Sequence, residues 1–422
     1  MHNRRTTWLR EVPDDWRITT IGSLYTLRNE KVSDKDYPPL SVTMKGIVPQ
    51  LESAAKTDDG DNRKLVKVGD FVINSRSDRR GSCGISAYDG SVSLINTILT
   101  PREAMHPGYY NWLFHTAAFA DEFYKWGHGI VDDLWTTRWQ EMKHIVVPVP
   151  SMEEQQAIAA YLDEQCVLID EAIAEAKASI EEYKGWKASI IFEAITKGTD
   201  KNAALKKSGI SWIGQIPSTW NMCPIKYCTV KIGSGKTPSG GAEVYSDSGI
   251  MFLRSQNIYN EGLRLNDVSY ISGKIDSEMK NTRVQYRDVL LNITGGSIGR
   301  CCIFDLKDTP ANVNQHVCIL RTDPTKLLPE FLRYFWNSAC GPIVIEQYQT
   351  GGNRAGLNFE QIGNIKIPFC SLDQQSSIVR HLDDVCEVID GLVETKEELI
   401  SDLESYKRSL IYEVVTGKRK VE

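Results

Sequence analysis

Two long stretches of the chain place apolar residues at alternating steps of three and four, which predicts two long helices. The stripe in residues 151–198 contains Ile169, Ile173, Ile180, Tyr183 and Ile190, and the stripe in residues 371–422 contains Ile389, Val393, Ile400, Leu403 and Leu410. Lys187 and Lys407 interrupt the two stripes at the same place. About 44 residues at ~1.5 Å each make a helix of roughly 65 Å, which needs a partner. The nearest partner of each helix is the other one.

The two helical stretches are copies of each other, 220 residues apart. Residues that recur at this offset include Gln155, Ile158, Leu162, Asp163 and Cys166, which become Gln375, Ile378, Leu382, Asp383 and Cys386. The Trp-x4-Pro-x2-Trp pattern at Trp8 returns at Trp212, so the chain reads globular, helix, globular, helix. We place the four parts at 1–150, 151–198, 199–370 and 371–422. A duplicated unit can fold with an internal two-fold, which suits a ligand with two half-sites such as duplex DNA.

The globular parts are predicted to be β-rich, which gives an α+β fold. Residues 71–74 and 289–292 are short apolar runs that each end at an Asn and a polar, glycine-bearing loop, and residues 318–320 form a further apolar run. Aromatic residues at helical spacing predict helices within 109–124 and 329–345. Ser151 and Ser371 are the expected N-caps of the long helices, and residues 198–209 are expected to form a linker.

Composition describes a globular chain with an uneven charge. At 422 residues it is too long for one core, and it contains no apolar run of the roughly 20 residues that span a bilayer. Ten cysteines without C-x-x-C spacing indicate reduced thiols in a cytoplasmic protein. The formal net charge is −6, but each helical stretch alone carries −6, so the globular parts together carry +6. A modest basic footprint on the globular parts is therefore compatible with nucleic acid.

No pattern in the chain predicts an active site. The segment Gly233-Ser234-Gly235-Lys236-Thr237 resembles the end of a phosphate-binding loop, but Val230 stands where the motif needs glycine and Pro238 follows at once. The seven histidines show no metal or triad spacing, and methyltransferase and nuclease motifs are missing. We expect no catalytic residues and no metal site in this chain.

Polar loops at the predicted strand ends carry the side chains that contact bases and phosphates. Any one of these residues could equally be an ordinary solvated loop residue, but the set as a whole favours DNA contact. The predicted DNA-binding residues are Lys45, Asn74, Ser75, Arg76, Arg79, Arg80, Lys236, Arg254, Gln256, Asn257, Asn292, Thr294, Ser297, Arg300, Asn353 and Arg354.

At this point the chain resembles the specificity subunit of type I restriction–modification systems. The resemblance covers essentially the whole chain and is cleaner in the second half, because the first copy reads Thr137-Arg138-Trp139-Gln140-Glu141-Met142. The segments that carry it are Leu357-Asn358-Phe359-Glu360-Gln361-Ile362 with Ile367-Pro368, Gln155-Gln156, Gln374-Gln375, Glu193-Ala194-Ile195-Thr196-Lys197-Gly198, Glu413-Val414-Val415-Thr416-Gly417-Lys418 and Gly69-Asp70-Phe71-Val72-Ile73-Asn74.

The resemblance implies a non-catalytic DNA-reading scaffold in the cytoplasm, with no membrane contact. Two target recognition domains would each read one half of a split double-stranded DNA target. The spacer helices would pair as an antiparallel coiled coil, and two methyltransferase subunits and motor–nuclease subunits would assemble on the chain. The chain itself would hold no cofactor; S-adenosylmethionine, ATP and magnesium would belong to the partner subunits.

Two other interpretations stay open. The chain could be an orphan specificity subunit that serves only a methyltransferase or acts as a regulator, and a gene neighbourhood without the motor subunit would favour this. It could also be a coiled-coil adaptor that binds no DNA, which a failure to retain duplex DNA at any salt concentration would favour.

Overall fold

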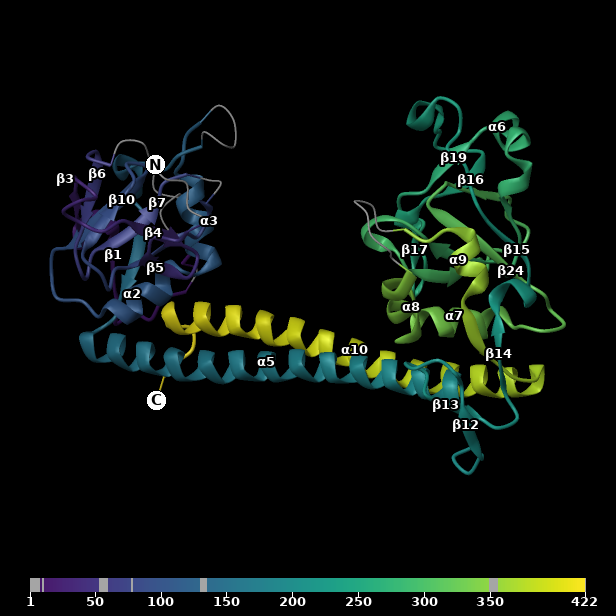
Figure 1. Cartoon of the computed structure of the whole chain (residues 1–422). Helices are drawn as coiled ribbons and strands as arrows, with labels where there is room; N and C mark the ends of the chain where they lie inside the picture. The colour runs from purple at the N-terminus through teal and green to yellow at the C-terminus, as the bar shows by residue number, and fades with distance from the viewer. Residues whose placement is uncertain are drawn as a thin grey trace. The chain divides into compact units, whose positions relative to one another are not determined.

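The computed structural model describes residues 8–9, 11–52, 60–76, 79–129, 135–348 and 356–421. Its contacts divide the chain into two compact units, the first formed by Met1–Lys177 with Glu397–Glu422 and the second by Ala178–Lys396. Each unit combines one β-rich globular part with a stretch of each long helix (Figure 1). The chain therefore crosses from unit to unit within the helices.

The first unit is built around an antiparallel four-stranded sheet of order β2-β10-β7-β8. Its strands and short helices are β1 (Arg17–Thr20), α1 (Ile21–Leu24), β2 (Tyr25–Arg28), β3 (Lys31–Val32), β4 (Leu40–Thr43), β5 (Gly46–Pro49), β6 (Arg63–Val66), β7 (Phe71–Asn74), β8 (Cys83–Ile85), β9 (Gly90–Val92), β10 (Asn96–Pro101), α2 (Pro107–Phe114), α3 (Ala117–Lys125), α4 (Trp139–Met142) and β11 (Val146–Val149). Aromatic rings of Tyr25, Phe71 and Phe114 are fully buried between the sheet and α2.

The second unit repeats this sheet as β15-β24-β21-β22 and adds a second four-stranded sheet, β19-β16-β23-β20. Its strands and short α-helices are β12 (Leu205–Lys207), β13 (Gln215–Pro217), β14 (Asn221–Pro224), β15 (Thr229–Ser234), β16 (Ile250–Leu253), β17 (Ile258–Tyr259), β18 (Gly262–Leu263), β19 (Ser269–Ile271), α6 (Gly273–Glu278), β20 (Arg283–Val284), β21 (Val289–Asn292), β22 (Cys301–Ile303), β23 (Ala311–Val313), β24 (Val317–Thr322), α7 (Pro329–Asn337), α8 (Cys340–Tyr348), α9 (Phe359–Asn364) and β25 (Lys366–Phe369). The internal repeat predicted from the sequence is confirmed.

The predicted strands at 71–74, 289–292 and 318–320 are confirmed as β7, β21 and part of β24. Each expected helical stretch is instead a pair of short helices. Thr116 ends the first of one pair and caps the next by accepting a hydrogen bond from Phe119 N, and Ser338 separates the other pair. The expected linker contains β12, which pairs with β13. The residues of β12 are exposed or half-buried, so the strand lacks the apolar alternation that would have announced it.

The long helices α5 (Met152–Lys197) and α10 (Leu372–Val415) begin with the same contacts. Ser151 caps α5 by accepting from Glu154 N at 3.3 Å, and Ser371 caps α10 by accepting from Gln374 N at 3.4 Å, as predicted. One turn later a buried glutamine fastens each helix to its own globular part. Gln155 accepts from His106 N, and Gln375 accepts from Leu328 N, both at 2.9 Å.

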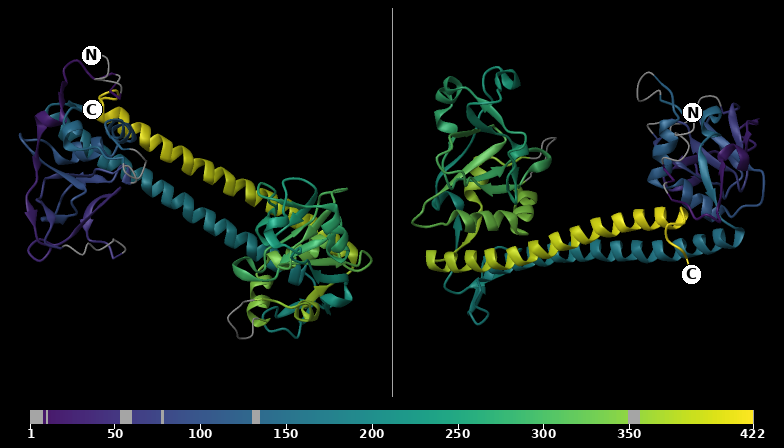
Figure 2. Two further views of the ribbon diagram at one scale, coloured as in Figure 1. Left: turned by 90° about the horizontal axis from the view of Figure 1, so that it is seen from above. Right: turned by 180° about the vertical axis from the view of Figure 1, so that it is seen from behind.

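Within each unit the two helices lie side by side and run in opposite directions (Figure 2). The predicted seam is confirmed: Ile169, Ile173 and Leu410 are buried in the first unit, with Ile400 and Leu403 partly buried, and Ile180 and Ile389 are buried in the second, with Tyr183, Ile190 and Val393 partly buried.

The lysines that interrupt the stripes make matching ion pairs across the seam. In the first unit Lys407 Nζ lies 2.6 Å from Asp170 Oδ1, and in the second Lys187 Nζ lies 2.6 Å from Asp390 Oδ1. Both pairs fit one antiparallel register, because a shift of 17 residues along α5 accompanies a shift of 17 back along α10. Among the described residues, no helix is long and apolar enough to cross a membrane.

Candidate nucleic-acid interface

Each unit builds the same loop after the third strand of its four-stranded sheet. After β7, the Asn74 amide donates to Ser82 O at 2.9 Å; after β21, the Asn292 amide donates to Arg300 O at 2.9 Å. Gly81 and Gly299 occupy the same place near the end of each loop, with φ of 76° and 90°. The loops 74–82 and 292–300 are therefore equal in length and closed by the same main-chain hydrogen bond.

The base of each loop is held by two further segments. Thr137 N donates to Ser75 O at 3.0 Å in the first unit, and Leu357 N donates to Ile293 O at 2.9 Å in the second. On the other side, Ser75 N donates to Ile95 O at 3.3 Å, and Ile293 N donates to His316 O at 3.0 Å. The frame of the loop is thus made of main-chain hydrogen bonds, which do not depend on side-chain identity.

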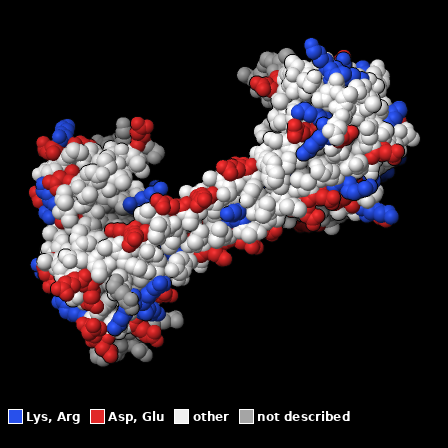
Figure 3. Space-filling model, turned by 90° about the horizontal axis from the view of Figure 1, so that it is seen from below, with Lys and Arg blue, Asp and Glu red and all other residues white. Residues whose placement is uncertain are grey.

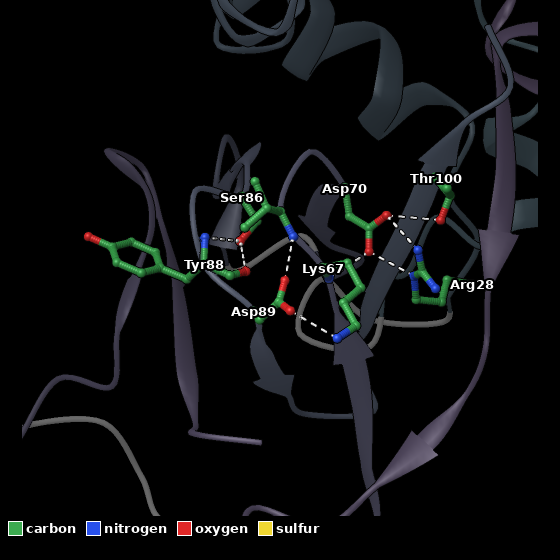
Figure 4. Close-up of polar contacts among 8 residues, drawn as sticks. Arg28, Lys67, Asp70, Ser86, Tyr88, Asp89 and Thr100 are labelled. Atoms are coloured by element: carbon green, nitrogen blue, oxygen red, sulfur yellow. Dashed lines mark hydrogen bonds and ion pairs between the residues drawn. The ribbon is translucent and has the colours of Figure 1, made fainter. Parts of the chain in front are cut away.

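A buried carboxylate braces the turn that leads into each of these strands (Figure 4). Asp70 accepts hydrogen bonds from Arg28 Nε at 2.7 Å, from Lys67 N at 2.8 Å and from Thr100 Oγ1 at 2.9 Å. The bond to Asp70 raises the pKa of the Arg28 guanidinium above its ordinary value. Asp288 in the second unit accepts from Gln285 N at 2.6 Å and Arg321 Nε at 2.7 Å.

The outer side of the first unit's turn carries a second carboxylate (Figure 4). Asp89 accepts from Val68 N and from Lys67 Nζ, both at 2.9 Å, and Ser86 bonds to the main chain of Tyr88. The hydrogen bond from Lys67 lowers the pKa of Asp89. The Gly-Asp signature before β7 therefore has a structural role.

Three exposed arginines line the first unit's loop: Arg76, Arg79 and Arg80. Arg80 forms an ion pair with Asp121 of α3, and its guanidinium lies 5.6 Å from the centre of the Tyr124 ring. Arg76 extends from an isolated β-bridge with Thr136. Cationic side chains on a fixed main-chain frame can bind phosphates and base edges.

Arginines of the second unit are braced by neighbouring side chains. Arg254 Nη2 donates to Asp267 O at 3.1 Å, and Gln256 Nε2 donates to Asp267 Oδ2 at 2.6 Å. Arg300 and Arg264 both lie against Tyr259, with guanidinium carbons 4.4 and 3.5 Å from the centre of the ring. This arrangement restricts the side chains before any ligand binds, which lowers the entropy lost on binding.

Several residues predicted to bind DNA have buried side chains that shape the loops. Asn257 accepts from Arg254 N and donates to Arg264 O, both at 2.9 Å. Asn292 donates to Ser255 O at 2.8 Å and to Ser297 Oγ at 3.1 Å. Asn74 Oδ1 accepts from Arg76 N at 3.0 Å, and Ser75 is also buried. These side chains position the loop rather than face outward.

The remaining predicted residues are distributed as follows. Lys45 is exposed in the turn between β4 and β5, Lys236 is exposed after β15, and Thr294 and Ser297 are partly buried in the loop 292–300. Asn353 and Arg354 lie outside the described residues. The structure therefore brings Asn292, Ser297 and Arg300 into one loop with Thr294, and joins Asn292 to the segment of Gln256 through Ser255.

Two turns that the sequence did not single out adjoin these loops, at residues 93–96 and 314–317. Leu94 and Ile95 are 42% and 39% exposed, and Gln315 is exposed at the equivalent place in the second unit. The turns are equivalent because Asn96 N bonds to Ser93 O and Val317 N bonds to Asn314 O. Exposed aliphatic pairs at a strand end are a weak signal in sequence, since they look like strand core.

The family model described as "Type I restriction modification DNA specificity domain" matches residues 217–401. The MjaVIII specificity subunit of Methanocaldococcus jannaschii is 24% identical over 97% of this chain and 94% of its own length. A putative MjaX specificity subunit from the same organism is 23% identical over 100% of this chain and 97% of its own. The chain belongs to the family of type I restriction specificity subunits.

Solved structures of specificity subunits share the fold. A chain from a structure titled for the assembly and conformational transition of the type I R-M system gives a TM-score of 0.75 at 13% identity, covering 96% of this chain and 98% of that one. The HsdS subunit from Thermoanaerobacter tengcongensis gives 0.55 at 15% identity, covering 97% and 98%.

The specificity-subunit fingerprint has a structural explanation in this chain. Asn358 and Gln361 form a reciprocal capping box at the start of α9, with both hydrogen bonds at 2.8 Å. Arg138 stands at the corresponding start of α4, where the N-cap side chain makes no hydrogen bond. This difference accounts for the weaker fingerprint of the first copy. Among the described residues, no group of three or more His, Cys, Asp or Glu side chains could hold a metal ion.

Proposed function

We propose that this specificity subunit is a non-catalytic DNA reader whose two units each recognise one half of a split double-stranded target. The observation that supports it most directly is the duplicated loop frame, 74–82 and 292–300, closed by the same hydrogen bonds but carrying different side chains. A repeated main-chain frame with different outward side chains is suited to reading two related but unequal half-sites.

The helices support a scaffolding role. On both helices, exposed apolar residues stand one position before a seam residue: Leu168 and Trp186 on α5, and Val388, Leu392, Leu399 and Tyr406 on α10. Leu168 corresponds to Val388, and Trp186 to Tyr406, at the repeat offset. This flank is opposite Asp163 and Asp383, which accept hydrogen bonds from Trp112 and Tyr334 of the globular parts.

Exposed apolar stripes of this kind mark protein-binding surfaces. Figure 3 shows the side of the helices that faces away from the globular parts, where acidic side chains gather and would repel DNA. We assign this side to two methyltransferase subunits, one per unit, with motor–nuclease subunits completing the complex. S-adenosylmethionine, ATP and magnesium belong to those partners, and the complex works in the cytoplasm.

The test is target selection from a randomised duplex library by the chain in complex with its cognate methyltransferase subunits. The expected product is two short defined sequences separated by a fixed gap. Selection of a single uninterrupted site, or of no site at any salt concentration, would contradict the proposal. Filter binding over a salt series then separates phosphate contacts from base contacts, because phosphate contacts weaken with salt regardless of sequence.

A matched insertion tests whether the helices set the gap. One four-residue turn after Glu175 lengthens α5 by at most ~6 Å, about two base-pair steps. In the register of the Lys407–Asp170 pair, the facing position on α10 follows Ser401, and a turn inserted there as well keeps both ion pairs in register. We expect the gap to change by one or two base pairs while both half-site sequences stay the same. Altered half-site letters would show that the helices do not act as a spacer.

A further inference from the structure

The turn at residues 314–317 meets two other segments of the second unit through a chain of side-chain hydrogen bonds. Thr237 Oγ1 donates to Gln315 Oε1 at 2.6 Å, and Gln315 Nε2 lies 2.8 Å from His316 Nε2. His316 Nδ1 in turn lies 2.6 Å from Thr294 Oγ1. The chain of bonds therefore connects the Gly-Ser-Gly-Lys-Thr segment, the turn and the loop 292–300.

The main chain fixes these three segments against one another. Gly235 N bonds to Asn314 O at 3.1 Å, and a Cβ at Gly235 would collide with Val313 O. The buried Asn314 side chain accepts from His316 N at 3.1 Å. The glycine of this segment is thus needed for close approach to the turn, which gives a physical reason for a motif that resembled a nucleotide-binding loop.

Gln315 is exposed, yet its amide is already held in place on two sides. A side-chain amide has two N–H donors and two acceptor lone pairs. In either orientation of the amide, Thr237 and His316 occupy one donor and one lone pair. One donor and one lone pair remain, which is the set that a bidentate contact to adenine N7 and N6 requires.

We propose that Gln315 reads an adenine in the half-site of the second unit, and that His316 and Thr237 are positioning residues that orient its amide. This inference rests on the proposed function and deepens it, because it names a base-reading residue and the base. The bound amide would keep its two protein hydrogen bonds while adding two to the base, so recognition needs no rearrangement of the turn.

The experiment is library selection with the complete complex of chain and methyltransferase subunits. Gln315→Ala should lower the preference for adenine at one position of the second half-site by about 5- to 150-fold, the worth of one bidentate contact. Gln315→Glu replaces the donors with acceptors and should move the preference at that position toward cytosine, whose N4 donates. A merely structural residue would not produce a new base preference.

Positioning is tested at the same base. His316→Ala should weaken the adenine preference less than Gln315→Ala does, and the double variant should lose little more than Gln315→Ala alone, because coupled residues are not additive. His316→Gln keeps a hydrogen-bonding group near the position of Nε2 and should restore part of the preference. Thr237→Val should act in the same direction as His316→Ala.

The first half-site is the internal control in each selection, since it depends on the other unit. An unchanged adenine preference in both Gln315 variants, with the first half-site intact, overturns the inference and leaves the proposed function standing. Failure of the unsubstituted complex to select a split target overturns the proposed function itself, and the inference with it.

Discussion

The turns at residues 93–96 and 314–317 hold the same main-chain position in the two units but present opposite chemistry. The first offers exposed Leu94 and Ile95, and the second offers Gln315 and His316. Aliphatic groups contact the thymine methyl, whereas an amide bonds to adenine. Because the frame is held by main-chain atoms, the outward side chains are free to differ. The comparison teaches that one backbone can carry two specificities.

Breaking the frame should have the largest effect. Asp70→Ala and Asp288→Ala each leave a mostly buried guanidinium without its carboxylate, in Arg28 and Arg321, whose side chains are only 23% exposed. Removing one partner of a buried pair is strongly destabilising, and we expect a loss of about 2–4 kcal/mol in the free energy of unfolding of the affected unit. Hydrogen–deuterium exchange resolved by segment should show lost protection in β7 or β21 respectively.

Asp89→Ala is the matched control for the frame, because Asp89 bonds to the same turn but its side chain is 52% exposed. Its substitution should leave protection of β7 nearly unchanged. Equal loss of protection in both units from either buried Asp variant would show that the two frames are not independent.

Substitution of the outward arginines should change specificity and leave the frame intact. Arg76→Ala should relax the first half-site only, and Arg254→Ala the second only, each by about 1–3 kcal/mol of base discrimination if the contact is bidentate. Library selection with each variant complex measures this. If both variants keep target choice and affinity, the assignment of these loops to DNA is wrong.

The sequence was sufficient to predict the repeat, the helix pair and the strands that lead into the loops. Periodicity predicted the seam because Ile169 and Ile389 sit in a pattern that only a helix satisfies. The marks of interruption, Lys187 and Lys407, were visible, but their partners were not. Asp170 and Asp390 lie 17 residues from them along the chain and on the opposite helix in space.

The candidate site was predicted less completely, because residue type does not report burial. Asn257 and Asn292 have the side chains of base readers, yet both are buried and spend their hydrogen bonds on loop carbonyls or hydroxyls. Gln315 lies in a three-residue polar gap between two apolar strands, and nothing in one dimension links it to Thr237, 78 residues away. Such convergence depends on the sheet order, which the sequence pattern alone did not supply.

A smaller effect is expected from the aliphatic turn. Leu94→Ala should reduce the preference for one thymine in the first half-site by about 1 kcal/mol, since it removes an apolar contact rather than two hydrogen bonds. Replacing that thymine with uracil, which lacks the methyl group, should weaken binding of the unsubstituted complex and leave Leu94→Ala unaffected. Equal sensitivity of both complexes to uracil would contradict a methyl contact, and Gln315→Ala serves as the control in the other unit.

The smallest expected effect concerns the turn residue before each buried carboxylate. Gly69 and Arg287 both have positive φ, 87° and 71°, and both donate their amide across the turn, to Ser86 O and Phe304 O. A side chain in this conformation costs about 1–2 kcal/mol, so Gly69→Ala should destabilise the first unit by roughly 1 kcal/mol. Arg287→Gly relieves the strain but gains unfolded-state entropy and loses the surface ion pair with Glu330. These terms nearly cancel, so the second unit should stay within about 0.5 kcal/mol of the unsubstituted protein. Thermal unfolding of both variants, with Glu330→Ala to measure the ion pair alone, decides whether the two turns are energetically equivalent; equal destabilisation by both substitutions would show that they are not.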